Sequence, residues 1–100
     1  MNRNTIMSPG FVIKACRHRS VEDMERLFEH HPIDCRDSYN NTPLHEASCW
    51  GREDLVRFLL SRGADRSATD QYGKTPLDWA ERRGHKAVAD LLRHEASKSS

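Results

Sequence analysis

The sequence predicts an all-α solenoid built from helix-turn-helix units, and two observations lead to this fold class. The first is an internal repeat: residues 42–47, Thr-Pro-Leu-His-Glu-Ala, return 33 residues later at 75–80 as Thr-Pro-Leu-Asp-Trp-Ala. Gly51 and Gly84 follow the two copies at the same spacing, and a fixed period in this range marks a stack of repeats. The second is composition: 36% apolar and 31% charged residues suit a thin core with a well-solvated outside.

The first unit is predicted over residues 10–36, after a flexible leader at 1–9. Two apolar groups recur in it at helical spacing. They are Phe11, Val12, Ala15 and Cys16 in the first helix, and Met24, Leu27 and Phe28 in the second. Ser20 is a suitable cap for the second helix, because two acidic residues follow in the first turn, where negative charge is favourable.

Two clearer units follow, over residues 37–69 and 70–95. In both, a threonine is placed to cap a helix and a proline occupies the first helical position, where no backbone hydrogen bond is lost. Thr75 also forms a capping-box-like pair with Asp78. The residues predicted to face inward are Leu44, Ala47, Ser48, Leu55, Val56, Leu59 and Leu60, and then Leu77, Trp79, Ala80, Val88, Leu91 and Leu92. Arg93 stands where the previous unit has Leu60, as expected of a terminal repeat, and residues 96–100 are predicted to be a flexible tail.

These units resemble the ankyrin repeat, whose pattern is a turn with Asp and Gly, then Thr-Pro-Leu-His, a short helix, Gly, a longer helix and Gly-Ala-Asp. Residues 37–69 match nearly all of it, residues 70–94 match to the end of the second helix, and residues 10–36 match as a degenerate capping repeat. The resemblance implies β-turn or hairpin tips before the full repeats. Asn40 replaces the turn glycine and tolerates the left-handed conformation. Asp78 replaces the family histidine, which ties adjacent repeats, so the last repeat is expected to lose part of that network.

Composition and spacing argue against most chemical functions. The formal net charge is +1, which favours neither nucleic acid nor an anionic membrane. Three cysteines without a Cys-x-x-Cys pair predict reduced thiols in the cytosol or nucleus. His45 and Cys49 are four residues apart, as a base and its nucleophile could be, but no orienting acid or oxyanion hole accompanies them. His30 and His31 are adjacent and lack the spacing of zinc ligands. We therefore expect no enzyme, cofactor or metal site.

The resemblance also implies where a partner would bind, because ankyrin repeats use their turn tips and the exposed side of their first helices. On this chain the implied residues are Ser38, Tyr39, Asn41, Cys49, Trp50, Gln71, Tyr72, Lys74, Arg82, Arg83, Arg17 and His18, with Arg36 and Thr69 beside them. Trp50 falls outside the apolar stripe and is expected to be exposed. Exposed Trp, Tyr and Arg are typical of interface hot spots. Packing of Trp50 against Arg17 or His18 is the alternative, and a solvated helix end is the alternative for Arg82 and Arg83.

The sequence therefore predicts a monomeric, intracellular protein-protein interaction module that acts as an adaptor, scaffold or inhibitor through its concave face. The alternative is a structural repeat segment of a larger protein whose function lies elsewhere. Three repeats are about the minimum for a stable stack, so only modest stability is expected.

Overall fold

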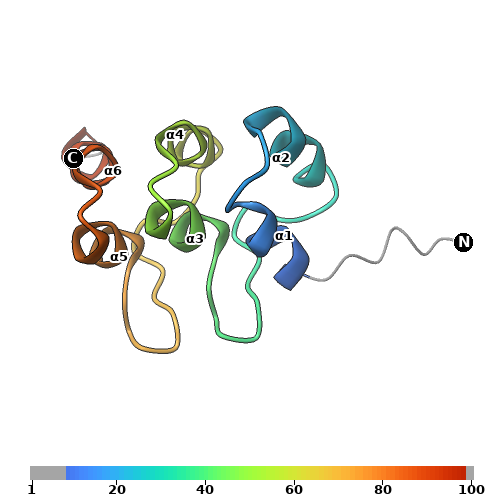
Figure 1. Cartoon of the computed structure of the whole chain (residues 1–100), viewed down its shortest axis with the longest axis horizontal. Helices are drawn as coiled ribbons and strands as arrows, with labels where there is room; N and C mark the ends of the chain where they lie inside the picture. The colour runs from blue at the N-terminus through green and yellow to red at the C-terminus, as the bar shows by residue number, and fades with distance from the viewer. Residues whose placement is uncertain (1–8, 99–100) are drawn as a thin grey trace, which may run out of the picture.

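The computed structural model describes residues 9–98 and contains six α-helices within that range. They are α1 (Pro9–Ala15), α2 (Val21–Leu27), α3 (Pro43–Cys49), α4 (Glu53–Ser61), α5 (Pro76–Arg83) and α6 (Lys86–Lys98). The first helices of the three units form one row and the second helices form another, and the loops before α3 and α5 project to the same side of the molecule (Figure 1). No strand occurs over residues 9–98, so the predicted all-α solenoid is confirmed.

The projecting loops are closed as the resemblance implied. In each, the N–H of the first residue donates to the carbonyl of the fifth, at 3.1 Å in 37–41 and at 3.0 Å in 70–74. Asn40 has a φ of 66° and Gly73 a φ of 75°, so asparagine takes the left-handed conformation that glycine takes in the next loop. Both loops are tight tips that present their side chains beside the first-helix row.

Hydroxyl caps fix where three of the helices begin. Thr42 accepts a hydrogen bond from the N–H of the third residue of α3 at 3.2 Å, and Thr75 does the same for Asp78 in α5 at 3.2 Å. Asp78 returns the bond by accepting from the Thr75 N–H at 2.9 Å, which completes the predicted capping box. Ser20 caps α2 at 3.1 Å. Because each cap satisfies an otherwise unpaired helix N–H, it contributes about 1 kcal/mol to stability.

The core lies between the two helix rows and runs continuously through the three units. Its fully buried members are mostly those that the sequence predicts, including Val12, Cys16, Met24, Leu44, Ala47, Leu55, Val56, Leu59, Ala80, Val88 and Leu92. Leu27, Phe28, Leu60, Leu77 and Leu91 are partly buried and pack against this cluster.

The prediction of a buried side chain was wrong for two residues, Phe11 and Trp79. Phe11 is 41% exposed, whereas Ile13 is buried at 1%. Val12 and Cys16 are buried as expected, so the buried face of α1 includes Ile13 and leaves Phe11 outside it. Trp79 is only half-buried and lies on the concave side. It occupies the position that Glu46 has one repeat earlier, on the side of the helix that faces the tips.

The ends of the folded part also differ from the prediction. Helix α1 begins at Pro9, inside the predicted leader, and the rest of that leader lies outside the described residues. Helix α6 continues to Lys98, so residues 96–98 are helical where a tail was expected, since no glycine or proline interrupts the sequence there. Arg93 is exposed and pairs with Glu81 and Asp90, whereas Leu60 at the same position one repeat earlier packs against the core.

Candidate partner-binding groove

A groove of about 320 Å³ lies between the first-helix row and the two tips. We call it the concave groove. Its lining residues are Arg17, Tyr39, Asn41, His45, Glu46, Cys49, Trp50, Asp70, Gln71, Tyr72, Trp79 and Arg83. Eight of the twelve residues that the sequence suggested for partner binding are among them. The structure therefore brings most of the predicted site together, although these eight residues come from all three repeats.

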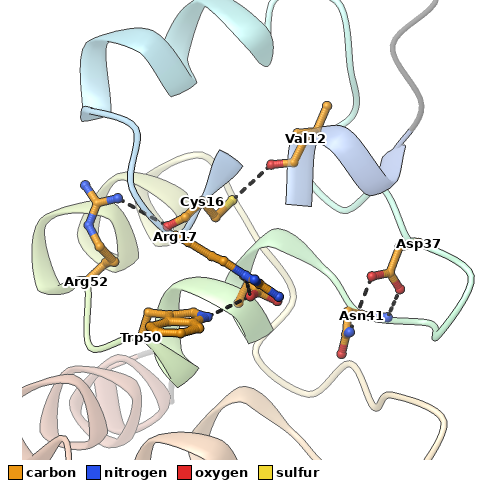
Figure 2. A network of polar contacts seen from close by, with 8 residues as sticks. Val12, Cys16, Arg17, Asp37, Asn41, Trp50 and Arg52 are labelled. Atoms are coloured by element: carbon orange, nitrogen blue, oxygen red, sulfur yellow. Dashed lines mark hydrogen bonds and ion pairs between the residues drawn. The ribbon is translucent and has the colours of Figure 1, made fainter. Parts of the chain in front are cut away.

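Trp50 lines the concave groove just after α3, in the middle repeat, and is 47% exposed. Its indole Nε1 donates to Glu46 Oε2 at 2.7 Å. Arg17 Nε donates to the same carboxylate oxygen at 2.6 Å, and the Arg17 guanidinium lies 5.3 Å from the centre of the Trp50 ring. Figure 2 shows the side chains of Arg17 and Trp50 next to each other. Trp50 is therefore exposed, as expected, and it also packs against Arg17, which was the alternative to contact with a partner.

The neighbouring repeats hold Trp50 in place from two directions. Arg83, at the end of α5, places its guanidinium 5.7 Å from the Trp50 ring centre, while Arg17 reaches the ring from the first repeat. Arg52 Nη1 donates to the carbonyl of Cys16 at 3.2 Å, which anchors the backbone beside Arg17 (Figure 2). A cation over a tryptophan ring is stabilised by about 0.5–1 kcal/mol at an exposed site. Trp50 is therefore an exposed side chain with a fixed orientation.

A second tryptophan repeats this arrangement in the last unit. Trp79 Nε1 donates to Asp70 Oδ2 at 2.8 Å, and the Arg82 guanidinium lies 5.7 Å from the Trp79 ring centre. Burial by itself raises the pKa of Asp70, but hydrogen bonds from the Lys74 N–H, the Trp79 indole and the Tyr72 N–H outweigh it and lower the pKa. Asp70 therefore stays ionised and holds Trp79 against the tip.

The tips present the two tyrosines of the predicted site. Tyr39 is 59% exposed and Tyr72 is 69% exposed. Each backbone N–H is held by the aspartate two residues before it, at 2.9 Å in both tips. The N–H of Gln71 donates to the Tyr39 carbonyl at 3.2 Å, so the tips are joined to each other and the tyrosines have a defined spacing.

The other suggested residues lie around the rim. Lys74 and Arg82 line a shallow hollow beside Trp79, and Ser38 lines another beside α1. His18 is exposed and lines neither the groove nor these hollows. Arg36 has a structural role, because its Nη1 donates to the carbonyls of Asn40 and Thr69 at 3.0 and 2.9 Å.

The sequence did not single out four groove residues as part of the site: His45, Glu46, Asp70 and Trp79. Glu46 precedes Trp50 by four residues on one helix, a spacing that places the two side chains on the same face. Trp79 repeats the position of Glu46 after 33 residues, which predicts the same orientation. The signals for both residues were therefore present in the repeat register, whereas Asp70 could be placed only by knowing how the tip folds back on α5.

The chemical candidates have structural roles. Both ring nitrogens of His45 are engaged, Nδ1 by Thr42 at 2.8 Å and Nε2 by the Lys74 carbonyl at 2.8 Å, so His45 is not a base for Cys49. Burial raises the pKa of the Cys16 thiol and that of the Cys35 thiol. In the part of the chain that the structure describes, no group of His, Cys, Asp and Glu could hold a metal ion. No described helix is long and apolar enough to cross a membrane.

Comparison with known proteins agrees with this architecture. The family model for ankyrin repeats, in three copies, matches residues 12–100. The chain is 42% identical over 62 residues to the E3 ubiquitin-protein ligase hecd-1 of Caenorhabditis elegans, and 39% identical over 67 residues to the ankyrin repeat protein OPG189 of vaccinia virus (strain Copenhagen).

It is also 35% identical over 86 residues to the transient receptor potential cation channel subfamily A member 1 of Drosophila melanogaster. These matches cover 59%, 65% and 79% of this chain, but only 2%, 12% and 7% of the three relatives. The residues matched by the family model run from within α1 to the end of α6, and the chain belongs to the ankyrin-repeat family.

Proposed function

We propose that this chain binds a protein partner in the concave groove and acts as an adaptor, scaffold or inhibitor. The observation that carries the proposal is the state of Trp50. It is half-exposed in the groove, yet its indole N–H is hydrogen-bonded to Glu46 and arginines of both neighbouring repeats lie over its ring. Tryptophan and arginine are the residue types most enriched at interface hot spots, and a side chain that is already ordered loses little entropy on binding.

The interface would be formed without large movement, because its parts are tied together in the free protein. The tips are joined through Gln71 and Tyr39, and His45 ties α3 to the tip before α5. A rigid concave face is the usual means by which stacked repeats bind their partners. The protein would act as a monomer, with the partner covering the aromatic groups that are now exposed.

A second possibility concerns the setting in which the groove works. The matched relatives are far longer than the region of similarity, which covers 12% or less of the three described above. We infer that the repeats could also serve as a structural or docking segment of a larger protein whose activity lies elsewhere. Reduced, free cysteines favour the cytosol or nucleus as the compartment in either case.

The test is to isolate a partner from the source cells, identify it and measure its affinity for purified protein by calorimetry. Replacing Trp50 with Ala should weaken binding by about 2 kcal/mol or more, which is a factor of about 30 in Kd. Trp50→Phe keeps an aromatic ring but loses the indole N–H, so its affinity should lie between that of the parent protein and that of Trp50→Ala. Arg57→Ala, on the exposed side of α4, should change nothing. Unchanged affinity in a folded Trp50→Ala protein would contradict the proposal.

A further inference from the structure

We propose that the concave groove takes an extended segment of the partner that carries several Asp or Glu side chains around a large apolar residue. This inference rests on the proposed function and specifies the chemistry of the partner. The whole chain is nearly neutral, with a formal net charge of +1, so the preference has to come from which hydrogen-bond donors and acceptors around the groove are still free.

The acidic groups on the groove side are already engaged. Glu46 accepts from Trp50 and Arg17, and Asp70 accepts from Trp79 and from two backbone N–H groups of its own tip. Asp37 holds the other tip and Asp78 caps α5 in the same manner. Glu81, which lines the hollow beside Trp79, pairs with Arg93. These carboxylates keep their negative charge, but most of their acceptor positions are occupied by the protein's own donors, so the groove offers a ligand few free acceptors.

The basic groups on the same side are available. Arg82 and Arg83 are exposed, each lies over a tryptophan ring, and neither forms an ion pair with a carboxylate of the residues that the structure describes. The Lys74 ammonium, which lines the hollow beside Trp79, likewise forms no ion pair with the side chains that the structure describes, those of residues 10–93. A guanidinium stacked on a ring keeps its N–H donors at its edge, where a carboxylate can bind them in a bidentate manner.

Carboxylates suit this arrangement better than a phosphate. Arg82 and Arg83 are adjacent on a helix, so their side chains diverge, and they lie over different tryptophans. The positive charges are therefore spread along the groove instead of converging on one point. Several single carboxylates along an extended chain match such a row, whereas one phosphate group would reach only part of it.

A cationic ligand is disfavoured although aromatic side chains line the groove. The ring of Trp50 already carries the guanidiniums of Arg17 and Arg83, and that of Trp79 carries Arg82. A ligand ammonium at Trp50 would have to compete with two guanidiniums, and at either ring it would lie close to positive charge. The exposed tyrosines at the tips and the free edges of the tryptophans remain for an apolar side chain placed between the acidic ones.

The two tryptophans of the chain both line the groove, so intrinsic fluorescence can follow binding without a label. The longest dimension of the molecule is 45 Å, and an extended peptide of about twelve residues spans about 40 Å. The probes are four such peptides with the same central Leu-Leu: one with Glu on both sides, one with Gln, one with Lys and one with phosphoserine.

The Glu peptide should bind, with an affinity that falls as salt is raised, and should bind at least about tenfold more tightly than the Gln peptide. Arg82→Gln with Arg83→Gln should reduce this affinity by about tenfold. Arg26→Gln with Arg57→Gln removes the same charge from α2 and α4, and should leave the affinity within about twofold, the range expected of distant surface charges.

Arg82→Lys with Arg83→Lys is the folding control. It keeps the positive charge at the end of α5 but removes the planar donors, and should give an intermediate affinity while thermal unfolding stays close to that of the parent. The carboxylate assignment is overturned if the Gln peptide binds as well as the Glu peptide, if the Lys peptide binds better, or if the phosphoserine peptide binds about tenfold more tightly. An equal loss of affinity in the variant with Arg26→Gln and Arg57→Gln would also overturn it, because the effect would then come from the overall charge of the protein and not from the groove.

The outcome can be separated from that of the proposed function. If a purified partner binds in a Trp50-dependent manner but the Glu peptide does not bind, the acidic chemistry is wrong and the groove still functions. If partner binding is insensitive to Trp50, the proposed function fails whatever the peptides do.

Discussion

His45 shows how one side chain connects two repeats and sets its own protonation state. The Lys74 carbonyl can only accept, so Nε2 carries the proton and donates to it at 2.8 Å. Nδ1 is then an acceptor, for the Thr42 hydroxyl at 2.8 Å and, less closely, for the Thr42 N–H at 3.3 Å. A proton on Nδ1 would face these donors. The neutral ring therefore fits its surroundings, and burial lowers the pKa of His45 below 6.5.

This geometry predicts an acid-sensitive stability. The unfolded chain takes up a proton at His45 as the pH falls through about 6.5, and the folded protein does so only at lower pH. The free energy of unfolding should therefore be constant above about pH 7 and should fall as the pH drops toward 5.5. His45→Gln should be less stable by about 1–2 kcal/mol at pH 7 and should lose most of this slope. Urea unfolding of both proteins from pH 5.5 to 8 measures it, and an equal slope in the variant would contradict the assignment.

At the scale of elements, the turn between α3 and α4 depends on its neighbour. Gly51 has a φ of 69°, and a Cβ added there would meet the His85 ring at 2.7–3.0 Å. His85 itself donates from Nε2 to the Cys49 carbonyl at 3.0 Å, so the α5–α6 turn is fastened to the end of α3. Gly84 has a φ of 77° but faces open space. The two glycines share a backbone conformation and differ only in what lies beside them.

The pair therefore separates backbone strain from repeat contact. Gly84→Ala should cost about 1–2 kcal/mol of stability, the penalty of a left-handed alanine. Gly51→Ala should cost about 1 kcal/mol more, because His85 has to move and its hydrogen bond to Cys49 is lost. Thermal or urea unfolding of the two variants gives the difference. Adding His85→Ala to both should remove most of it, and equal costs in the presence of His85 would show that the contact carries no energy.

The helices and the groove can be predicted from the sequence to different extents. Helix starts at Thr42, Thr75 and Ser20 follow from local hydrogen bonding, so the sequence was sufficient for them. The groove follows from the repeat register, which correctly placed Trp50 outside the core. The inward position predicted for Trp79 is wrong, because the repeat register places this residue with Glu46 on the concave side. The guanidiniums over the two rings depend on side-chain conformations that no local pattern specifies.

At the scale of the whole molecule, the three repeats are unequal. The middle repeat has a neighbour on each side, whereas each outer repeat has one within the described residues (Figure 1). The first repeat is also made of two seven-residue helices and lacks the Thr-Pro start of the others, so it has fewer local means of holding its shape. In a linear stack each unit contributes its own stability and that of its interfaces. The concave groove nonetheless takes Arg17 from this first repeat.

Amide hydrogen exchange should reveal this gradient. Exchange in α3 and α4 should require the largest opening free energy, while α1 and α2 should open at about 1–3 kcal/mol less, through loss of the first repeat alone. Mass spectrometry of peptic fragments under native conditions measures both regions in one experiment. His45→Gln is the matched perturbation, because it breaks the tie between α3 and the last tip: it should lower protection in α5 and the tip before it more than in α1. If all helices exchange with one free energy in both proteins, the stack unfolds as a single unit, and the first repeat would then keep Arg17 in the groove as firmly as the middle repeat keeps Trp50.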